Sequence, residues 1–165
     1  MELAMKLHHL HALAGMLAFF LIATFWLGTA ATELSGSTAA IAWVKSAILS
    51  GMVVLIPALV ATGASGFSLG RGMRLPAVVA KKRRMPFIAG NGLLILLPSA
   101  IFLATKAEAG AFDTAFYLVQ GLELVAGATN LVLIGLNIRD GLAISRRRHA
   151  SAPRSKAAVR SSISG

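Results

Sequence analysis

The stretch from Leu7 to Ala30 reads LHHLHALAGMLAFFLIATFWLGTA, and it is the first of four apolar segments in a chain of 165 residues. The other three run over residues 39–64, 86–105 and 114–138. A helix needs about 20 apolar residues to cross a hydrocarbon layer of about 30 Å. Each segment is near that length. The connections after the first and third segments are too short to join anything but adjacent antiparallel helices, so the sequence predicts an all-α, integral membrane, antiparallel four-helix bundle.

The composition argues against a soluble globule, because 56% of the residues are hydrophobic and the mean hydropathy is +0.76. We expect one transmembrane domain over residues 1–144. Residues 145–165 are small, polar and cationic, which predicts a disordered tail. The sequence contains no cysteine, and this removes disulfides and thiolate metal sites.

The charges between the segments are unequal. Residues 65–85 contain six cations and no acid, and seven more cations follow the fourth segment. The other two connections contain three acids and one cation, namely Glu33, Glu108, Asp113 and Lys106. Because Lys and Arg collect on the cytoplasmic side, we expect a bacterial inner-membrane protein with both termini in the cytoplasm. The basic residues then contact anionic lipid headgroups, and nucleic acid is not expected as a partner.

Two further expectations concern local structure. The 65–85 connection contains several glycines and Pro76, so we expect it to be irregular. Trp26, Trp43 and Tyr117 fall near the ends of their segments on the outer side, where aromatic rings favour the membrane interface.

The fourth segment carries a polar stripe. Its members recur every three or four residues and are Gln120, Glu123, Gly127, Asn130, Ile134 and Asn137. At about 100° per residue these positions share one face of a helix, which we expect to point into the bundle. Hydrogen bonds between helices would explain the asparagines. Asn91, Asn130 and Asn137 also approach the membrane level of the histidines at the start of the first segment.

Glu123 and Lys45 are ionisable residues inside predicted spans. By helix rise, Glu123 lies on the order of 12 Å below the outer surface and Lys45 roughly 8–9 Å below it. An unpaired carboxylate at such a depth costs several kcal/mol. We therefore predict a Lys45–Glu123 contact between neighbouring second and fourth segments. The alternative for Lys45 is a side chain that extends to the outer interface.

Three of the four histidines lie at the start of the first segment, as His8, His9 and His11. His8 and His11 project from one side of a helix, so they are candidate ligands for haem b or a single transition metal. The alternative is that they are polar residues at the point where the helix enters the lipid. The later segments contain no histidine, so a haem would need a different second ligand or a dimer.

The residues Lys6, His8, His9 and His11, followed by Trp26-Leu27-Gly28, resemble the first helix of the copper-resistance D and membrane-bound protoporphyrinogen oxidase families. The resemblance implies a haem or copper role for His8 or His11. The remaining segments resemble a family of uncharacterised small bacterial membrane proteins instead.

Two functions follow from the sequence. The first is a haem- or metal-handling, redox-associated membrane protein that uses His8 and His11. The second is a non-catalytic membrane subunit or interaction protein, in a homo-oligomer or a larger membrane complex, whose polar residues only pack the bundle.

Overall fold

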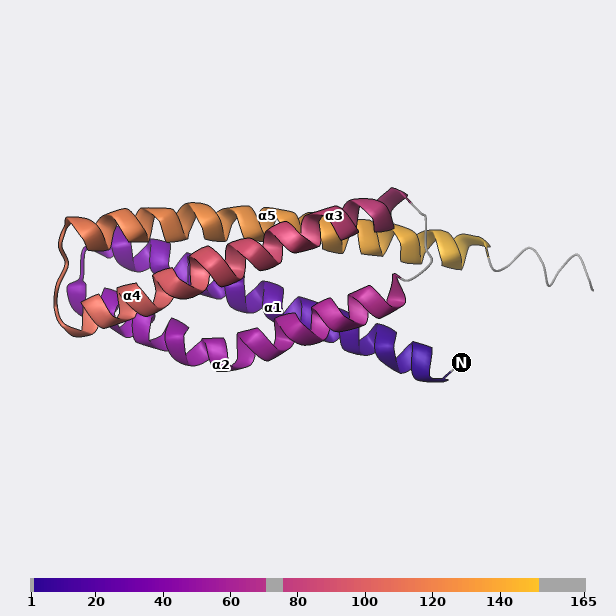
Figure 1. Ribbon diagram of the computed structural model, residues 1–165, viewed down its shortest axis with the longest axis horizontal. Helices are drawn as coiled ribbons and strands as arrows, with labels where there is room; N and C mark the ends of the chain where they lie inside the picture. The colour runs from indigo at the N-terminus through magenta and orange to yellow at the C-terminus, as the bar shows by residue number, and fades with distance from the viewer. Residues whose placement is uncertain (1, 71–75, 152–165) are drawn as a thin grey trace, which may run out of the picture.

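The structure, a computed structural model, describes residues 2–70 and 76–151. Apart from the short connections at residues 36–37 and 109–113, the chain is helical in these ranges (Figure 1). They are α1 (Glu2–Ser35), α2 (Thr38–Leu69), α3 (Pro76–Asn91), the π-helical turn η1 (Gly92–Leu96), α4 (Leu97–Glu108) and α5 (Thr114–Ser151). α3, η1 and α4 form one continuous helical stretch.

Four helical stretches are long and apolar enough to cross a membrane. They are Met5–Ser35, Thr38–Leu69, Val78–Glu108 and Thr114–Ala143. The prediction of an all-α chain with four apolar helices of spanning length is therefore confirmed, and the chain is a multi-pass membrane protein.

Each helix of the bundle packs against its two neighbours in a closed cycle. α2 packs against α1 and α4, while α5 packs against α1, α3 and α4 (Figure 1). This arrangement leaves α2 and α5 at opposite corners of the bundle. The chain reverses direction at two connections, and Gly36 and Gly110 in these connections adopt positive φ angles of 67° and 65°. Glycine adopts this conformation without the steric cost that a Cβ atom would add.

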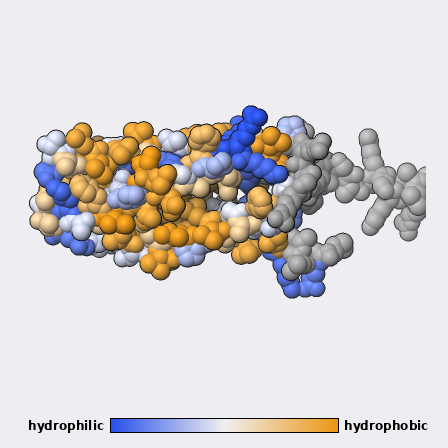
Figure 2. Space-filling view, viewed as in Figure 1, coloured by the Kyte–Doolittle hydropathy of each residue, from blue (hydrophilic) through white to orange (hydrophobic). Residues whose placement is uncertain are grey.

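The two ends of the bundle differ in what they contain. One end, which we call the hairpin end, carries the α1–α2 and α4–α5 connections. The other, the basic end, carries the start of α1, the end of α2, the start of α3 and the last turns of α5 (Figure 1). Between them the surface is mostly apolar, as Figure 2 shows on one face. Apolar side chains on the outside of the bundle fit contact with lipid.

Small side chains let the helices approach closely. One core cluster joins Ala18 and Ile22 of α1 to Leu55 and Ala58 of α2. A second, at the hairpin end, joins Ile41, Leu103, Ala107 and Phe116. Close approach through small residues is typical of helix packing in membranes.

The third span contains a π-helical turn just before Pro98. The backbone N–H of Leu97 bonds to the carbonyl oxygen of Gly92, five residues earlier. Proline has no N–H and its ring collides with the preceding turn, so a wider turn accommodates it. The helix therefore accommodates Pro98 by a local change of helix type.

Several boundaries differ from the sequence expectation. The 65–85 connection is mostly helical, because α2 continues to Leu69 and α3 begins at Pro76; the expectation of an irregular segment was wrong there. α5 continues as a helix to Ser151, beyond the expected domain end at residue 144. Residues 71–75 and 152–165, which include most of the expected disordered tail, lie outside the described residues.

Candidate functional site

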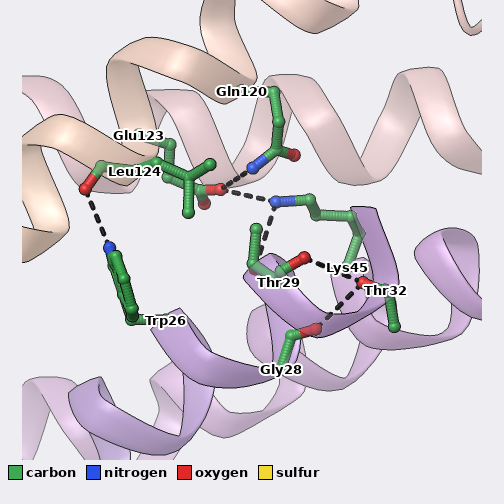
Figure 3. Close-up of polar contacts among 8 residues, drawn as sticks. All are labelled: Trp26, Gly28, Thr29, Thr32, Lys45, Gln120, Glu123 and Leu124. Carbon is green, nitrogen blue, oxygen red and sulfur yellow. Dashed lines mark hydrogen bonds and ion pairs between the residues drawn. The ribbon is translucent and has the colours of Figure 1, made fainter. Parts of the chain in front are cut away.

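Lys45 is the centre of a polar cluster at the hairpin end of the bundle. Its side chain is only 1% exposed, and its Nζ donates a hydrogen bond to Oε2 of Glu123 at 2.5 Å. A longer contact of 3.5 Å joins Nζ to the Thr29 hydroxyl. Figure 3 shows the ammonium pointing from α2 towards Glu123 on α5 and Thr29 on α1. The predicted contact between Lys45 and Glu123 is confirmed.

The helices that carry this ion pair are not the packed neighbours that we expected. α2 and α5 occupy opposite corners, so the pair crosses the bundle interior. The four-carbon stem of Lys45 makes this possible, because it carries the ammonium well beyond the radius of its own helix. The pair therefore links two helices that have few backbone contacts with each other.

Gln120 completes the polar surroundings of Glu123. Its Nε2 donates to Oε2 of Glu123 at 3.3 Å, from one turn earlier on α5 (Figure 3). Its Oε1 is buried and has no hydrogen-bond partner among the described residues. Burying a hydrogen-bond acceptor without a donor destabilises the folded state by about 1–3 kcal/mol. This oxygen could therefore accept a hydrogen bond from a group outside the protein chain, such as water.

Glu33 lies near the polar cluster around Lys45, although the sequence predicts that it belongs to the connection after the first segment. α1 continues to Ser35, so Glu33 lies one helical turn after Thr29 on the same face. Its carboxylate interacts electrostatically with both Lys45 and Glu123. Its Oε1 is buried without a hydrogen-bond partner among the described residues. The four-residue spacing from Thr29 was the signal that could have identified it.

We call Glu33, Lys45 and Glu123, together with Thr29 and Gln120, the acid–lysine centre. The centre contains two carboxylates and one ammonium, so it carries one net negative charge when all three ionisable groups are charged. A low-dielectric interior disfavours such a charge. One additional proton or a monovalent cation would neutralise the centre.

A small cavity of about 70 Å³ lies beside the centre, on the side that faces the middle of the bundle. Glu123 and Thr29 contribute to its wall, and the remaining lining is mostly apolar, including Phe25, Met52 and Leu96. By volume it is large enough for water, but only the wall near Glu123 offers hydrogen-bond partners.

Trp26 also borders this cavity, and its position differs from the expectation of an interfacial ring. Its Nε1 donates to the carbonyl oxygen of Leu124 at 2.8 Å (Figure 3). Its ring packs over Gly127, where a Cβ atom would lie 2.9 Å from Cδ1 of the ring. Gly127 therefore allows α1 to approach α5. Trp43 and Tyr117 are exposed, as an interfacial position requires.

The asparagines of the predicted stripe join α3 to α5 further from the hairpin end. Nδ2 of Asn91 donates to Oδ1 of Asn130 at 2.9 Å and to the carbonyl oxygen of Ala126 at 2.8 Å. Nδ2 of Asn130 makes a longer bond of 3.4 Å to the carbonyl oxygen of Ile88. Gln120, Asn130 and Asn137 are all buried, which confirms that the stripe faces the interior.

A second ion pair lies at the basic end. Nη1 of Arg84 donates to Oδ2 of Asp140 at 2.7 Å and to Oδ1 of Asn137 at 3.3 Å. The Arg84 and Asp140 side chains are 24% and 16% exposed, so this pair is wetter than the pair at the hairpin end. Asn137 also contacts the sulfur of Met85 at 3.8 Å.

His11 is already engaged by protein groups on both ring nitrogens. Nδ1 lies 3.1 Å from the carbonyl oxygen of Thr62 and 3.0 Å from Oγ of Ser65. Nε2 lies 3.0 Å from Nζ of Lys81. This network fits a neutral ring that donates from Nδ1 and accepts from the ammonium at Nε2. As a haem or metal ligand, His11 would have to give up one of these contacts, so its surroundings do not fit that role.

The two first-helix candidates do not converge on one site. His8 is exposed, whereas His11 points between α2 and α3. Within residues 2–70 and 76–151, no group of three or more His, Asp or Glu side chains is arranged to hold a metal ion.

The acid–lysine centre thus places a buried ion pair and two buried side-chain oxygens without hydrogen-bond partners among the described residues inside a bundle of four apolar helices. No protein family, curated protein or solved structure gives a match to this chain.

Proposed function

We propose that this protein carries protons across a bacterial inner membrane and that the acid–lysine centre is where a proton is bound. In this proposal the four spans form an antiparallel bundle with the basic end in the cytoplasm and the hairpin end outside. The positive-inside distribution of Lys and Arg supports that orientation.

One observation carries the proposal: a buried Lys45–Glu123 ion pair lies inside a membrane-spanning bundle, and a second carboxylate, Glu33, acts electrostatically on both of its members. Lys45 compensates the charge of one carboxylate, and the other carboxylate is neutral only when it holds a proton. Ionisable groups within transmembrane segments commonly mark proton relays and ion pathways.

The surroundings supply a route to and from the centre. Glu33 is partly exposed near the end of α1, so it exchanges protons with water at the hairpin end. Glu123 borders the cavity that faces the bundle middle. Beyond it, polar groups recur at the Asn91–Asn130 pair and at the Arg84–Asp140 pair. A proton released from Glu123 towards the basic end therefore meets polar side chains at two further levels.

Proton flux into liposomes tests the proposal. The purified chain is reconstituted into vesicles that contain a pH-sensitive dye, with potassium and valinomycin for charge balance, and the outer solution is acidified. We expect faster internal acidification than in protein-free vesicles, and loss of the difference in the Glu123→Gln variant. Glu108→Gln is the matched control, because Glu108 is an exposed carboxylate at the same end. Equal rates for the wild type and Glu123→Gln would contradict the proposal.

The subunit hypothesis makes the opposite prediction for this experiment. If the polar residues only pack the bundle, the chain binds no transported proton and its vesicles acidify at the protein-free rate. The haem or metal hypothesis rests on His8, whose ring is exposed and makes no hydrogen bond in the described part of the chain. An absorption spectrum and a metal analysis of the purified protein test it separately.

A further inference from the structure

A groove between α3 and α5 at the basic end has no role in the proposed proton pathway. Its volume is about 480 Å³. Six residues line it: Arg83, Arg84, Phe87, Asn91, Thr129 and Leu133. The groove is therefore charged where two arginines lie next to each other and largely apolar along the rest of its length.

The order of these residues along α3 matches the layers of a lipid leaflet. Arg83 lies near the start of the third span, Phe87 lies one turn deeper and Asn91 a further turn deeper, at about 6 Å per turn of four residues. Phe87 is 72% exposed, so its ring is available to an occupant of the groove. An occupant that is anionic at one end and apolar along its length would match both parts.

The charge at the groove's mouth is not fully compensated by the protein. Asp140 pairs with Arg84 through Nη1 alone, and an arginine has five N–H donors. Arg83 is exposed and has no ion-pair partner among the described residues. Guanidinium groups bind phosphate through paired hydrogen bonds, which makes a phosphate the natural anion at this position.

We propose that this groove binds one anionic phospholipid, with its phosphate at Arg83 and Arg84 and an acyl chain along Phe87 and Leu133. A second copy of this chain fits the groove less well. It would bring its own cationic basic end towards these arginines, and like charges brought together at an interface oppose association. A diffuse attraction of lipids to the basic end would not require the groove.

Lipid-dependent thermal stability of the full chain in a neutral detergent tests this site. Phosphatidylglycerol, phosphatidylcholine and soluble glycerol phosphate are titrated separately, and native mass spectrometry counts bound lipids. We expect one tightly held phosphatidylglycerol and a higher Tm with that lipid, but no rise with phosphatidylcholine or with glycerol phosphate, which lacks the acyl chain. Arg83→Gln should weaken phosphatidylglycerol binding about tenfold.

The matched control is Lys82→Gln, which removes the same charge from the neighbouring exposed position outside the groove lining. It should retain binding within about twofold. Equal loss in the two variants would show diffuse attraction and overturn the proposal, as would equal stabilisation by phosphatidylcholine. A lipid-free dimer that dissociates when Phe87 is changed to Ser would assign the groove to a second copy and also overturn it. If glycerol phosphate raised the Tm as much as phosphatidylglycerol does, the site would bind phosphate without an acyl chain, and this result would also overturn the proposal.

Discussion

The two ends of the bundle each contain an ion pair between helices, but the balance of charge around the pairs is opposite. At the hairpin end, Lys45 pairs with Glu123 and Glu33 adds a second carboxylate nearby, so acids outnumber bases in the acid–lysine centre. At the basic end, Asp140 contacts both Arg84 and Arg139, so bases outnumber acids. The pair at the hairpin end is buried, with side chains 1% and 12% exposed, whereas the pair at the basic end is 24% and 16% exposed. In our proposals a proton neutralises the buried end and the phosphate of an anionic lipid neutralises the basic end.

The largest effect is expected from breaking the buried pair. Glu123→Gln removes the direct partner of Lys45 and should cost about 3 kcal/mol, the low end of the range for a broken buried pair because Glu33 remains as a counter-charge. The double variant Lys45→Met/Glu123→Gln should recover much of the loss, because a buried ammonium is no longer present. Thermal unfolding in detergent measures both variants. Strict additivity of the two substitutions would mean that the pair does not form.

The next largest effect is expected from Gly127→Ala, which tests how closely α1 packs against α5 beside the acid–lysine centre. Gly127→Ala places a Cβ atom 2.9 Å from the Trp26 ring, so the ring and its hydrogen bond to Leu124 must shift. Overpacking of this kind costs about 2 kcal/mol. The control is Gly121→Ala on the same helix, where nothing lies within 4 Å of the new atom. Similar melting temperatures for the two variants would contradict the close packing of α1 on α5.

A smaller effect is expected from the corresponding charge removal at the basic end. Arg84→Gln breaks the contact with Asp140, but both side chains are partly exposed, so water replaces much of the lost interaction. We expect a loss of about 1 kcal/mol in thermal unfolding experiments. If Arg84→Gln lowered the unfolding free energy as much as Glu123→Gln does, the exposed pair would matter as much as the buried pair, and burial would not explain the difference between the two ends.

The sequence predicted the parts of this structure that follow from periodicity and length. Four apolar segments gave the four helices, and spacings of three and four residues gave the inward stripe from Gln120 to Asn137. Helix rise placed Lys45 and Glu123 at similar depths, which was enough to predict their contact. These are properties of single helices, so they need no knowledge of how the helices are arranged.

The features that the sequence did not predict depend on helix ends and on packing. Glu33 was missed because the apolar segment ends before the helix does. Trp26 was expected at the membrane interface because it lies near the end of the first apolar segment. Nothing in the sequence around it indicates the hydrogen bond to the carbonyl oxygen of Leu124. The diagonal arrangement of α2 and α5 depends on which faces pack together, and Lys45 reaches across in a way that helix depth alone does not indicate.

The smallest effect concerns the Lys106–Asp113 pair at the hairpin end, in which Asp113 is exposed and lies outside the spans. Asp113 accepts hydrogen bonds from Lys106 and from the backbone N–H of Phe116, and these lower the pKa of its carboxyl. Since the folded-state pKa lies below the unfolded value, the stabilisation is present above the unfolded pKa and is lost as the pH falls through the folded pKa. Asp113→Asn keeps a helix-capping side chain and should flatten this part of the Tm–pH curve slightly. If the Tm of the wild type and that of Asp113→Asn fell equally at acid pH, Asp113 would not be the source of this pH-dependent stabilisation.

Infrared spectroscopy of carboxyl groups at neutral pH is the most direct test of the central claim that one proton is shared within the acid–lysine centre. The chain has only six acids, so a single protonated carboxyl band is measurable. We expect one such band in the wild type and its loss in both Glu33→Gln and Glu123→Gln. Lys45→Met should show a second protonated carboxyl, because no ammonium remains in the centre. A wild-type spectrum without a protonated carboxyl, or a band that both glutamine variants leave unchanged, would contradict it.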